Sequence, residues 1–567
     1  MRVFQGIAET LATAGVTDVF TFLSRDIAKL VAELDLRGVR VHSARHEHVA
    51  VNMADGYSRA SGRLGVALIG QGVGFTNALN GLITATKAHS QVVVFVGEVP
   101  GASTHAGTFQ RKHLDQRALL DVLGVPHIDL DSPATATADV AAALELATRH
   151  PLVVSLPEEV MESEAGADPT SVAEPRLAGA PREDDLAAIV GALRGAPDGR
   201  AVILAGRGAV RSDALPILRR LGERTGALLG SSIHARGAFR GDPFDVGVVG
   251  GLATPLGKEL LAEAEVVLAF GASLSYDQTQ DGAIFGSATI VQVDRDAAGL
   301  QRYGPVDIPV LADVHLTAEA LLARLEAGVL TRPGYRTEDV RDRIATFSMA
   351  DTFTDQSGPE GLDMRALTVA LDRLLPAERT VVVDGGSCKY YPLTFLPSPD
   401  AQAFLWPTEY GAIGISVGAA LGAAVARPDR LTVLCTGDGG LMMTLADLDL
   451  ATREGLRLLV VVYDNQGLVA EVNYLKDEGY TGDVAAYDNP SLEAVARGFG
   501  FDGATITELS DLQALAPRLA ALGEPGARPM LLDCAVMARK LRPDYVSHAR
   551  RKALAEGGQL LAAAAGG

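Results

Sequence analysis

Short runs of apolar residues, rich in Val, Ile and Leu, alternate along the chain with longer Ala- and Leu-rich stretches. A short apolar run bounded by polar residues or Gly is typical of a buried parallel strand, and the stretches between such runs have the length of helices. The predicted strands span residues 65–69, 92–96, 152–155, 202–205, 266–270, 289–293, 381–383, 431–435 and 458–463. This alternation predicts an α/β fold built from doubly wound parallel sheets.

Two segments interrupt the alternation. Residues 162–183 and 332–360 are polar, contain Gly and Pro and lack periodicity, so we interpret them as linkers. They divide the chain into three predicted domains, residues 1–165, 182–335 and 361–540, followed by a C-terminal tail at 541–567. Three domains also suit a chain of 567 residues, which is too long for a single hydrophobic core.

The composition is that of a globular protein, with 48% hydrophobic and 21% charged residues. Acidic side chains outnumber basic ones by 70 to 50, and the resulting net charge of −20 disfavours binding to nucleic acid or to an anionic membrane surface. Small molecules are therefore the expected partners.

The N-terminal residues show no secretory signal pattern, and every apolar run is far shorter than the roughly 20 residues that span a bilayer. The three cysteines, Cys388, Cys435 and Cys534, are widely spaced, which suits a reducing compartment better than a disulfide framework or a thiolate metal site. We expect a cytoplasmic protein.

The motif with the clearest chemical meaning lies in the C-terminal third. The predicted strand 431–435 leads into Asp438-Gly439-Gly440, and the predicted strand 458–463 leads into Asn465-Gln466-Gly467. A βαβ crossover brings the ends of two such strands to one edge of the sheet. Oxygen donors there suit Mg²⁺, and glycines allow backbone N–H groups to approach a phosphate. Asp-Gly alone is also a common turn dipeptide, but the complete pattern is far more restrictive.

The complete pattern resembles the metal-diphosphate motif of the thiamine diphosphate enzymes, which begins with GDG and ends with Asn. The resemblance implies that Asp438, Asn465 and the backbone carbonyl of Gly467 hold a Mg²⁺ ion that bridges the cofactor's diphosphate, with Gly439 and Gly440 beside it. Asp464 stands where this family usually has the first of two Asn residues.

Two further segments of the C-terminal block are similar to the same family. Residues 406–422, WPTEYGAIGISVGAALG, resemble GGLGTMGFGLPAAIG, which implies that Ile413 supports the bent cofactor between its rings and that the carbonyl of Gly411 accepts from the 4′-amino group. Residues 384–388, DGGSC, resemble the second diphosphate loop, with contacts from Gly386, Ser387 and Cys388. Without the resemblance, the first segment is a tightly packed helix start and Cys388 is a buried spacer.

The N-terminal block carries Arg45-His46-Glu47-His48 followed by VAVNMADGYSRASG, and GQGVGFTNAL follows the predicted strand 65–69. A charged cluster of this kind is usually a solvated helix end. The two stretches resemble REEHAAFMADGYARATG and SGPGATNL of the family, so Glu47 falls on the catalytic glutamate that exchanges a proton with N1′ of the aminopyrimidine. GQGVG is a poor dinucleotide-binding fingerprint, because its spacing is GxGxG.

Gln110 is a second candidate catalytic residue, and Arg25, Phe75 and His113 are candidate substrate contacts. Gly107-Thr108-Phe109-Gln110 resembles GTDAFQE, which implies that Gln110 hydrogen-bonds the reacting acyl group. Phe75 is expected to face the same space, and so is His113, for which a surface turn is an equally good explanation. Arg25 is placed to bind a carboxylate or a polar acceptor, with a surface salt bridge as the equal alternative.

The chain departs from acetolactate synthases at two places. Residues 20–25, FTFLSR, replace a FGYPGG-type turn. Ser273 stands where those enzymes have an Arg that contacts FAD, so the resemblance does not extend to FAD and we do not expect this cofactor.

The resemblance covers nearly the whole chain and implies a pyrimidine-binding, a central and a diphosphate-binding domain, in that order. In this family the glutamate and diphosphate domains of one site come from different subunits, which implies a homodimer or homotetramer. The expected activity is that of an acetolactate synthase-like carboligase, which decarboxylates a pyruvate-like 2-oxo acid and transfers the acyl-anion equivalent to a second carbonyl compound. The alternatives are a non-ligating decarboxylase, a benzaldehyde-lyase-like carboligase, or a non-catalytic paralogue that binds a nucleotide.

Overall fold

The computed structural model describes residues 1–99, 112–166, 179–327 and 334–538. The chain forms two compact units. The first contains Met1–Arg176, Ser357–Pro392 and Gln402–Ala538, and the second contains Leu177–Gln356 and Leu393–Ala401. We call the part of the first unit up to residue 166 the N-terminal domain, its part from residue 357 the C-terminal domain, and the second unit the central domain.

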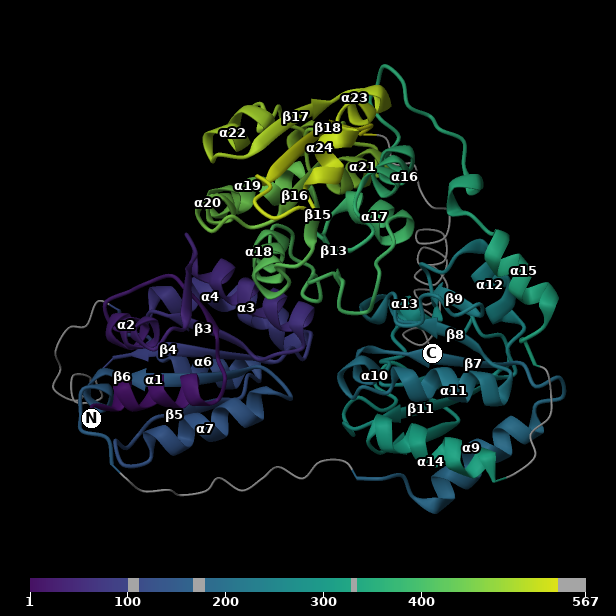
Figure 1. The fold of residues 1–567 in the computed structure, drawn as a ribbon, viewed down its shortest axis with the longest axis horizontal. Helices are drawn as coiled ribbons and strands as arrows, with labels where there is room; N and C mark the ends of the chain where they lie inside the picture. The colour runs from purple at the N-terminus through teal and green to yellow at the C-terminus, as the bar shows by residue number, and fades with distance from the viewer. Residues whose placement is uncertain (100–111, 167–178, 328–333, 539–567) are drawn as a thin grey trace, which may run out of the picture. The chain divides into compact units, whose positions relative to one another are not determined.

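Each domain is built on a parallel sheet of six strands with helices around it (Figure 1). The N-terminal sheet has the order β2-β1-β3-β4-β6-β5. Its strands are β1 (Asp18–Thr21), β2 (Arg40–Ser43), β3 (Gly65–Ile69), β4 (Val92–Glu98), β5 (His127–Asp129) and β6 (Leu152–Pro157). The helices are α1 (Val3–Thr13), α2 (Ala28–Leu36), α3 (Glu47–Ser61), α4 (Val73–Lys87), α6 (Gln116–Leu123), α7 (Ala136–Ala147) and α8 (Glu158–Met161).

The C-terminal sheet has the order β14-β13-β15-β16-β18-β17. Its strands are β13 (Arg379–Val383), β14 (Phe404–Leu405), β15 (Leu431–Gly437), β16 (Leu458–Asp464), β17 (Asp502–Ile506) and β18 (Met530–Ala535). The helices of this part of the chain are α16 (Met364–Leu374), α17 (Tyr390–Phe395), α18 (Ser416–Ala426), α19 (Asp438–Met443), α20 (Asp449–Arg453), α21 (Val469–Asp477), α22 (Leu492–Gly498), α23 (Leu509–Ala514) and α24 (Ala516–Ala521).

The central sheet has the order β12-β11-β10-β7-β8-β9. Its strands are β7 (Ala201–Ala205), β8 (Leu228–Ser231), β9 (Asp245–Val248), β10 (Val266–Phe270), β11 (Thr289–Asp294) and β12 (Ile308–Leu311). The helices are α9 (Glu183–Gly195), α10 (Arg207–Arg211), α11 (Leu215–Thr225), α12 (Pro255–Ala262), α13 (Tyr276–Thr279), α14 (Val314–Glu326) and α15 (Glu338–Thr346). Three parallel sheets with flanking helices confirm the predicted fold class. The structure describes no helix that is long and apolar enough to cross a membrane.

The segment 332–360 is not the irregular linker that we expected, because it contains the helix α15. Thr337 caps this helix by accepting from the N–H of Val340 at 3.3 Å, and acidic residues occupy its first turn. Val340 is its one buried side chain. A helix held by a cap and by two apolar side chains, the buried Val340 and the partly buried Ile344, leaves little hydrophobic periodicity in the sequence, which is why the pattern suggested a linker.

The N-terminal and C-terminal domains share a hydrophobic core where α3 packs on α18. A Cβ atom on Gly56 would overlap the backbone carbonyl of Ala419, and a Cβ atom on Gly422 would overlap the carbonyl of Met53. The two helix backbones therefore lie in direct contact, which only glycine permits. This contact fixes the two domains of the first unit against each other within one chain.

Candidate active site

Asp384 joins three loops at the carboxyl edge of the C-terminal sheet. It follows β13 and is almost fully buried. Its carboxylate accepts from the N–H of Gly414 at 3.0 Å, from Ser416 Oγ at 3.0 Å and from Thr436 Oγ1 at 2.9 Å. Burial raises the pKa of this carboxyl, and these hydrogen bonds oppose the shift. Asp384 thus holds the loop before α18 and the end of β15 in fixed positions.

Glycines let the same loops approach one another closely. A Cβ atom on Gly440 would overlap Oδ2 of Asp384, and a Cβ atom on Gly385 would lie 2.9 Å from Cγ2 of Ile413. The next glycine, Gly386, has a φ of +85°, a conformation that residues with side chains rarely adopt. The structure therefore places the DGGSC loop directly beside Ile413, in the loop before α18.

Cys388 is buried in this loop, with Sγ 3.7 Å from the carbonyl oxygen of Gly385. Burial raises the pKa of the Cys388 thiol well above its usual range, and the nearby Asp384 adds to the shift. A thiol kept in its neutral form is a poor nucleophile, so Cys388 is suited to packing in the loop and not to covalent chemistry.

Asp438 is the first residue of α19 and is buried at the end of β15. Its Oδ2 atom accepts from the N–H of Gly467 at 3.0 Å and from Nδ2 of Asn489 at 2.7 Å. The same Nδ2 atom donates to Oδ1 of Asp464 at 2.8 Å. Both of these donors to Asp438 contact Oδ2, and the backbone N–H of Gly439 also contacts the carboxylate.

Asn489 reaches this site because a long segment returns to its own starting point. After β16 the chain runs through α21 and comes back, so that Leu468 donates to the carbonyl of Ala485 at 2.9 Å and Tyr487 donates to the carbonyl of Gln466 at 3.1 Å. An isolated antiparallel bridge joins Gly467 to Ala486. Nothing in the sequence pointed to Asn489, because its position depends on this closure over more than twenty residues.

The residues present fit a divalent cation. Asn465 is 9% exposed, and among the residues that the structure describes its Oδ1 atom has no hydrogen-bond partner. An unsatisfied buried oxygen costs about 1–3 kcal/mol. Burial raises the pKa of Asp438, and although Asn489 opposes this shift the charge of Asp464 adds to it. A hard cation coordinated by these oxygen atoms would relieve both costs, which suits Mg²⁺.

Glu47 is the first residue of α3 and is 7% exposed. Nδ2 of Asn77 donates to its Oε2 atom at 3.0 Å, and Nδ1 of His46 lies 3.9 Å from the same oxygen. A Cβ atom on Gly74 would lie 3.4 Å from Oε1. The carboxylate is therefore held against the first turns of α4, within the motif GQGVGFTNAL, and Asn77 of that motif is a contact that we did not predict.

The segments that carry Arg25 and His113 lie side by side, because their neighbours Asp26 and Lys112 form an ion pair at 3.8 Å. Arg25 and His113 are exposed, on segments that follow β1 and precede α6. Phe75 is fully buried in the core of the N-terminal domain. Gln110 lies outside the described residues. The backbone around Arg25 is fixed by its neighbour Asp26, which accepts from the N–H of Gln71 at 2.8 Å.

Within one chain, Gly411 and Glu47 lie towards opposite ends of α3. Glu409, two residues before Gly411, pairs with Arg59 at 2.7 Å. Arg59 lies twelve positions after Glu47 on α3, which corresponds to about 18 Å of helix.

Three family models match the chain in the order of its domains. They are the thiamine pyrophosphate enzyme N-terminal TPP binding domain at residues 1–119, the central domain at 186–321 and the C-terminal TPP binding domain at 384–534. The matches cover well over half of the chain and include Glu47, Asp438 and Asn465.

Curated proteins with several activities are similar over most of their length. Acetolactate synthase 1, chloroplastic, of Nicotiana tabacum is 27% identical over 568 residues, covering 94% of this chain and 81% of its own. Sulfoacetaldehyde acetyltransferase of Alcaligenes xylosoxydans xylosoxydans is 25% identical, covering 90% and 88%. A Pseudomonas aeruginosa protein named probable 2-ketoarginine decarboxylase is 27% identical, covering 88% of each chain. The three matched domains and these relatives establish that the chain belongs to the thiamine pyrophosphate enzyme family, in its acetolactate synthase-like branch.

Proposed function

We propose that the protein is a thiamine diphosphate- and Mg²⁺-dependent carboligase. It decarboxylates a pyruvate-like 2-oxo acid and transfers the acyl group to a second carbonyl compound. When bound, thiamine diphosphate supplies the nucleophilic carbon and the electron sink that cleavage beside a carbonyl requires. The observation that carries the proposal is the unsatisfied Oδ1 atom of Asn465 beside the buried carboxylate of Asp438, enclosed by glycine loops.

The C-terminal domain holds the cofactor's diphosphate in this proposal. Asp438, Asn465 and the carbonyl of Gly467 coordinate the ion, and Gly439 and Gly440 line the same loop. Gly386, Ser387 and Cys388 offer backbone groups from the loop after β13. Ile413 supplies apolar support between the cofactor's rings, and Gly411 accepts from its 4′-amino group.

Glu47 acts as the acid-base group. Its carboxylate lies in a nearly water-free position, and Asn77 fixes its orientation, so that the other oxygen remains available to share a proton with a ring nitrogen. Gln110, Arg25, Phe75 and His113 are the proposed substrate contacts.

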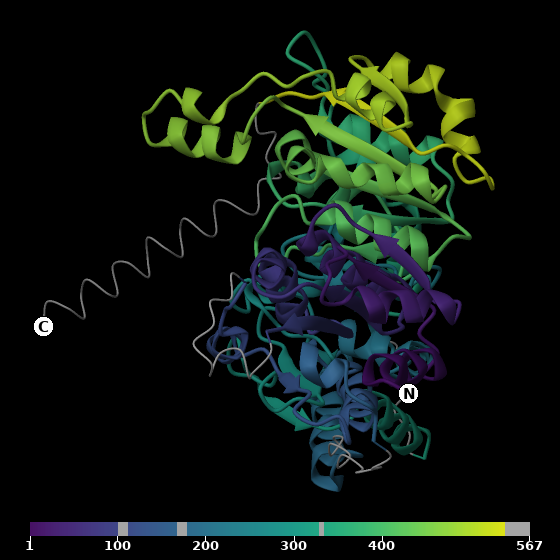
Figure 2. The same ribbon diagram turned by 90° about the vertical axis from the view of Figure 1, so that its left-hand side faces the viewer.

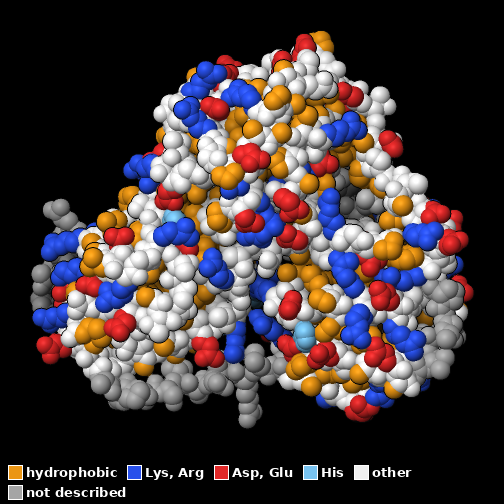
Figure 3. Space-filling model, in the orientation of Figure 1, with side chains coloured by type: hydrophobic (Ala, Val, Ile, Leu, Met, Phe, Trp, Pro, Cys, Tyr) orange, Lys and Arg blue, Asp and Glu red, His pale blue; other side chains and the backbone are white. Residues whose placement is uncertain are grey.

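The working unit is a homodimer or a dimer of such dimers, in which Glu47 of one copy serves the diphosphate site of another. Apolar side chains exposed on the loops around the two half-sites support this arrangement, because monomeric proteins rarely expose such groups together. Val73 on the N-terminal side, and Tyr410, Met442 and Met443 on the C-terminal side, are all exposed. Figure 3 shows charges of both signs interspersed with apolar side chains on one face, without a continuous basic stripe among the described residues.

The segment that closes at Asn489 adds to this exposed apolar surface. It projects from the C-terminal domain (lime green in Figure 2) and exposes Tyr474, Tyr480 and Val484, the last of which is 92% exposed. A second copy of the chain would cover these side chains.

A 2-oxo acid decarboxylase without ligation is the second candidate. It is favoured by the similarity to the protein named 2-ketoarginine decarboxylase, which is as close in sequence as the acetolactate synthase of tobacco. Arg25 is exposed on the segment that follows β1, and its guanidinium would suit a polar or carboxylate-bearing substrate in either activity.

Product analysis decides between these activities. The protein is incubated with thiamine diphosphate, Mg²⁺ and a panel of ¹³C-labelled 2-oxo acids, with and without aldehyde or 2-oxo acid acceptors, and the products are identified by mass spectrometry. Ligated products that contain carbon from both partners support the carboligase, whereas aldehyde and CO₂ alone support the decarboxylase. The absence of turnover, together with an unchanged melting temperature on addition of thiamine diphosphate and Mg²⁺, would refute both.

A further inference from the structure

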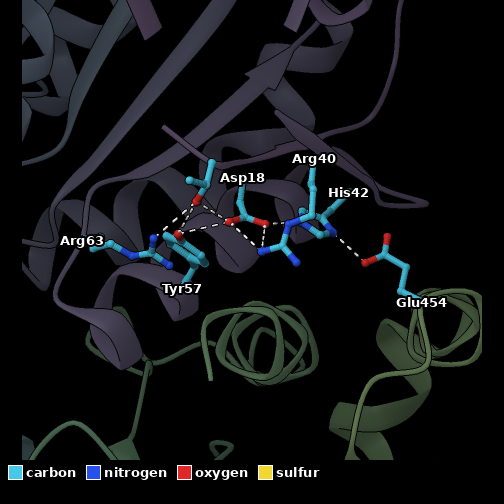
Figure 4. Close-up of polar contacts among 7 residues, drawn as sticks. Asp18, Arg40, His42, Tyr57, Arg63 and Glu454 are labelled. Carbon is cyan, nitrogen blue, oxygen red and sulfur yellow. Dashed lines mark hydrogen bonds and ion pairs between the residues drawn. The ribbon is translucent and has the colours of Figure 1, made fainter. Parts of the chain in front are cut away.

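His42 lies between two carboxylates that belong to different domains (Figure 4). It is the third residue of β2 and is 4% exposed. Its Nε2 atom is 2.8 Å from Oδ1 of Asp18, and its Nδ1 atom is 2.6 Å from Oε2 of Glu454. Asp18 belongs to β1 of the N-terminal domain, whereas Glu454 follows α20 of the C-terminal domain.

The geometry favours a charged imidazole between two ionised carboxylates. An ionised carboxylate only accepts hydrogen bonds, and a neutral imidazole has a single N–H, so it can donate to only one of the two. Both contacts are satisfied when His42 carries two N–H groups and a positive charge. Phe20 stacks on the ring with centroids 5.1 Å apart, which fixes the plane of the imidazole between its two partners.

The surrounding groups favour this charge state. Arg40 pairs with Asp18 at 2.8 Å, Thr17 donates to Asp18 at 2.7 Å, and Tyr57 donates to it at 3.3 Å. Burial raises the pKa of Asp18, but the hydrogen bonds from His42, Thr17 and Arg40 outweigh it and lower the value to about 2. Burial lowers the pKa of His42, and its hydrogen bonds to Asp18 and Glu454 outweigh burial, so that its pKa is raised.

The residues after His42 lead directly to Glu47 and are held by the same part of the C-terminal domain. Arg453 donates to the carbonyl of Ser43 at 2.8 Å, and the N–H of Arg45 donates to Oδ1 of Asp447 at 2.6 Å. The Arg45 side chain also pairs with Asp449, but this pair is solvent-exposed and therefore weak. Among these contacts with the C-terminal domain, the one made by His42 is a buried side-chain contact.

We propose that His42 is a positioning residue for Glu47, and that the bridge formed by Asp18, His42 and Glu454 fixes the start of α3 against the C-terminal domain of the same chain. This inference rests on the proposed function of Glu47. A buried charge pair often contributes little net stability, but it specifies one arrangement strongly, because breaking it leaves a buried charge without a partner. Glu47 lies five residues after His42. The segment between them is held by the C-terminal domain at Ser43 and Arg45, so a shift of the bridge would also move Glu47.

The bridge is also sensitive to pH. Below the folded-state pKa of His42 both contacts are intact. As the pH rises through that raised value the ring loses one proton, and one carboxylate then faces an acceptor nitrogen. The start of α3 is expected to loosen on the alkaline side only.

The test compares Glu454→Gln with Arg40→Gln, and uses His42→Gln as a second disruptive variant. Glu454→Gln keeps the shape of the partner but removes the charge that holds the His42 proton. Arg40→Gln removes an exposed partner of Asp18 and leaves the contact between domains unchanged. Hydrogen-deuterium exchange of residues 43–50 is measured on the ligand-free protein, and kcat and the KM for thiamine diphosphate are measured from pH 6 to pH 9.

In Glu454→Gln we expect faster exchange at residues 43–50, a kcat lowered by about 10- to 100-fold with an unchanged KM for the cofactor, and an alkaline limb displaced to lower pH. Arg40→Gln should match the unmodified protein in all three. Unchanged exchange in Glu454→Gln, or changed exchange with an unchanged kcat, would overturn the proposal. The exchange measurement needs no substrate, so a failure of the proposed activity is seen separately as absent turnover in the unmodified protein.

Discussion

A Cβ atom on Gly440 would overlap Oδ2 of Asp384, so the loops after β13 and β15 lie as close together as glycine allows. Asp384 in turn binds the loop before α18 through Gly414 and Ser416. The geometry of the proposed cation site therefore depends on contacts with no room for an added methyl group.

Replacing Gly440 by Ala should disrupt this arrangement. The added Cβ atom meets a buried carboxylate that is fixed by three donors, and we expect a loss of about 1–3 kcal/mol in the free energy of unfolding together with loss of the thermal shift caused by thiamine diphosphate and Mg²⁺. Gly439→Ala is the matched control for the free energy of unfolding, since its Cβ atom would meet only the hydroxyl end of Tyr487 and the tip of Leu468. Equal effects in the two variants would contradict this explanation.

Asn465→Leu should separate stability from metal binding. Leucine removes the unsatisfied Oδ1 atom while keeping a similar volume, so the cofactor-free protein should gain about 1–2 kcal/mol in the free energy of unfolding. The same variant should lose the Mg²⁺-dependent increase in melting temperature. Asn465→Asp keeps an oxygen ligand and should retain that increase. A Leu variant that still responds to Mg²⁺ would remove Asn465 from the ligand set.

Glu47→Gln should lower turnover by about 10²–10⁴-fold, because the amide cannot exchange a proton. Asn77 can still donate to the carbonyl oxygen of the introduced amide in place of the carboxylate, so binding of thiamine diphosphate should be nearly unchanged by calorimetry. Normal turnover in this variant would exclude Glu47 as the acid-base group.

Asp447→Asn should stabilise the protein at alkaline pH. Burial raises the pKa of Asp447 to about 6, with a hydrogen bond from Arg45 opposing the shift and the charge of Asp449 adding to it. Because this folded-state pKa lies above the ordinary value, ionisation disfavours the folded state above about pH 6 and has no such effect near pH 4. Urea unfolding at pH 8 should show higher stability for Asn, and the difference should vanish as the pH falls towards 4.

Gly422→Ala should weaken the contact between α3 and α18. Its Cβ atom would overlap the carbonyl of Met53, a backbone atom that cannot move without displacing its helix, and we expect a loss of about 3 kcal/mol. Gly191→Ala, in another helix, should instead stabilise the protein. Nothing lies within 4 Å of its Cβ position in α9, so Ala should add up to about 1 kcal/mol through its helix propensity. Differential scanning calorimetry should show a lower melting temperature for Gly422→Ala and an unchanged or higher one for Gly191→Ala. The opposite change in either variant would contradict this interpretation.

The sequence allowed many of the buried strands to be predicted because their apolar runs are continuous, although the buried strands β1, β8 and β18 were missed. The run at 431–435 became β15 (Leu431–Gly437), and the run at 458–463 became β16 (Leu458–Asp464). The edge strand β17 (Asp502–Ile506) was not predicted, because it is buried on one side only and reads DGATI. Its pairing with β18 supplies the hydrogen bonds that its side chains do not suggest.

The same distinction applies to the candidate site. Asp438 and Asn465 follow buried strands directly, so the parallel topology was enough to predict that they share an edge. Asn489 and the His42 bridge depend on contacts between segments far apart in the chain, and neither leaves a local pattern. The burial of Phe75 in the core of the N-terminal domain was not predicted either, since a motif resemblance indicates a position but not how its side chain packs.

The closure between Gly467 and Ala486 has a consequence for how this enzyme can diversify. Both ends of the intervening stretch are fastened to each other and, through Asn489, to Asp438. The length and side chains of residues 470–481 can therefore change without altering the spacing of the proposed metal-ligand atoms. Related proteins can therefore differ in this stretch, and gain new contacts there, while the proposed cofactor-binding residues keep their positions.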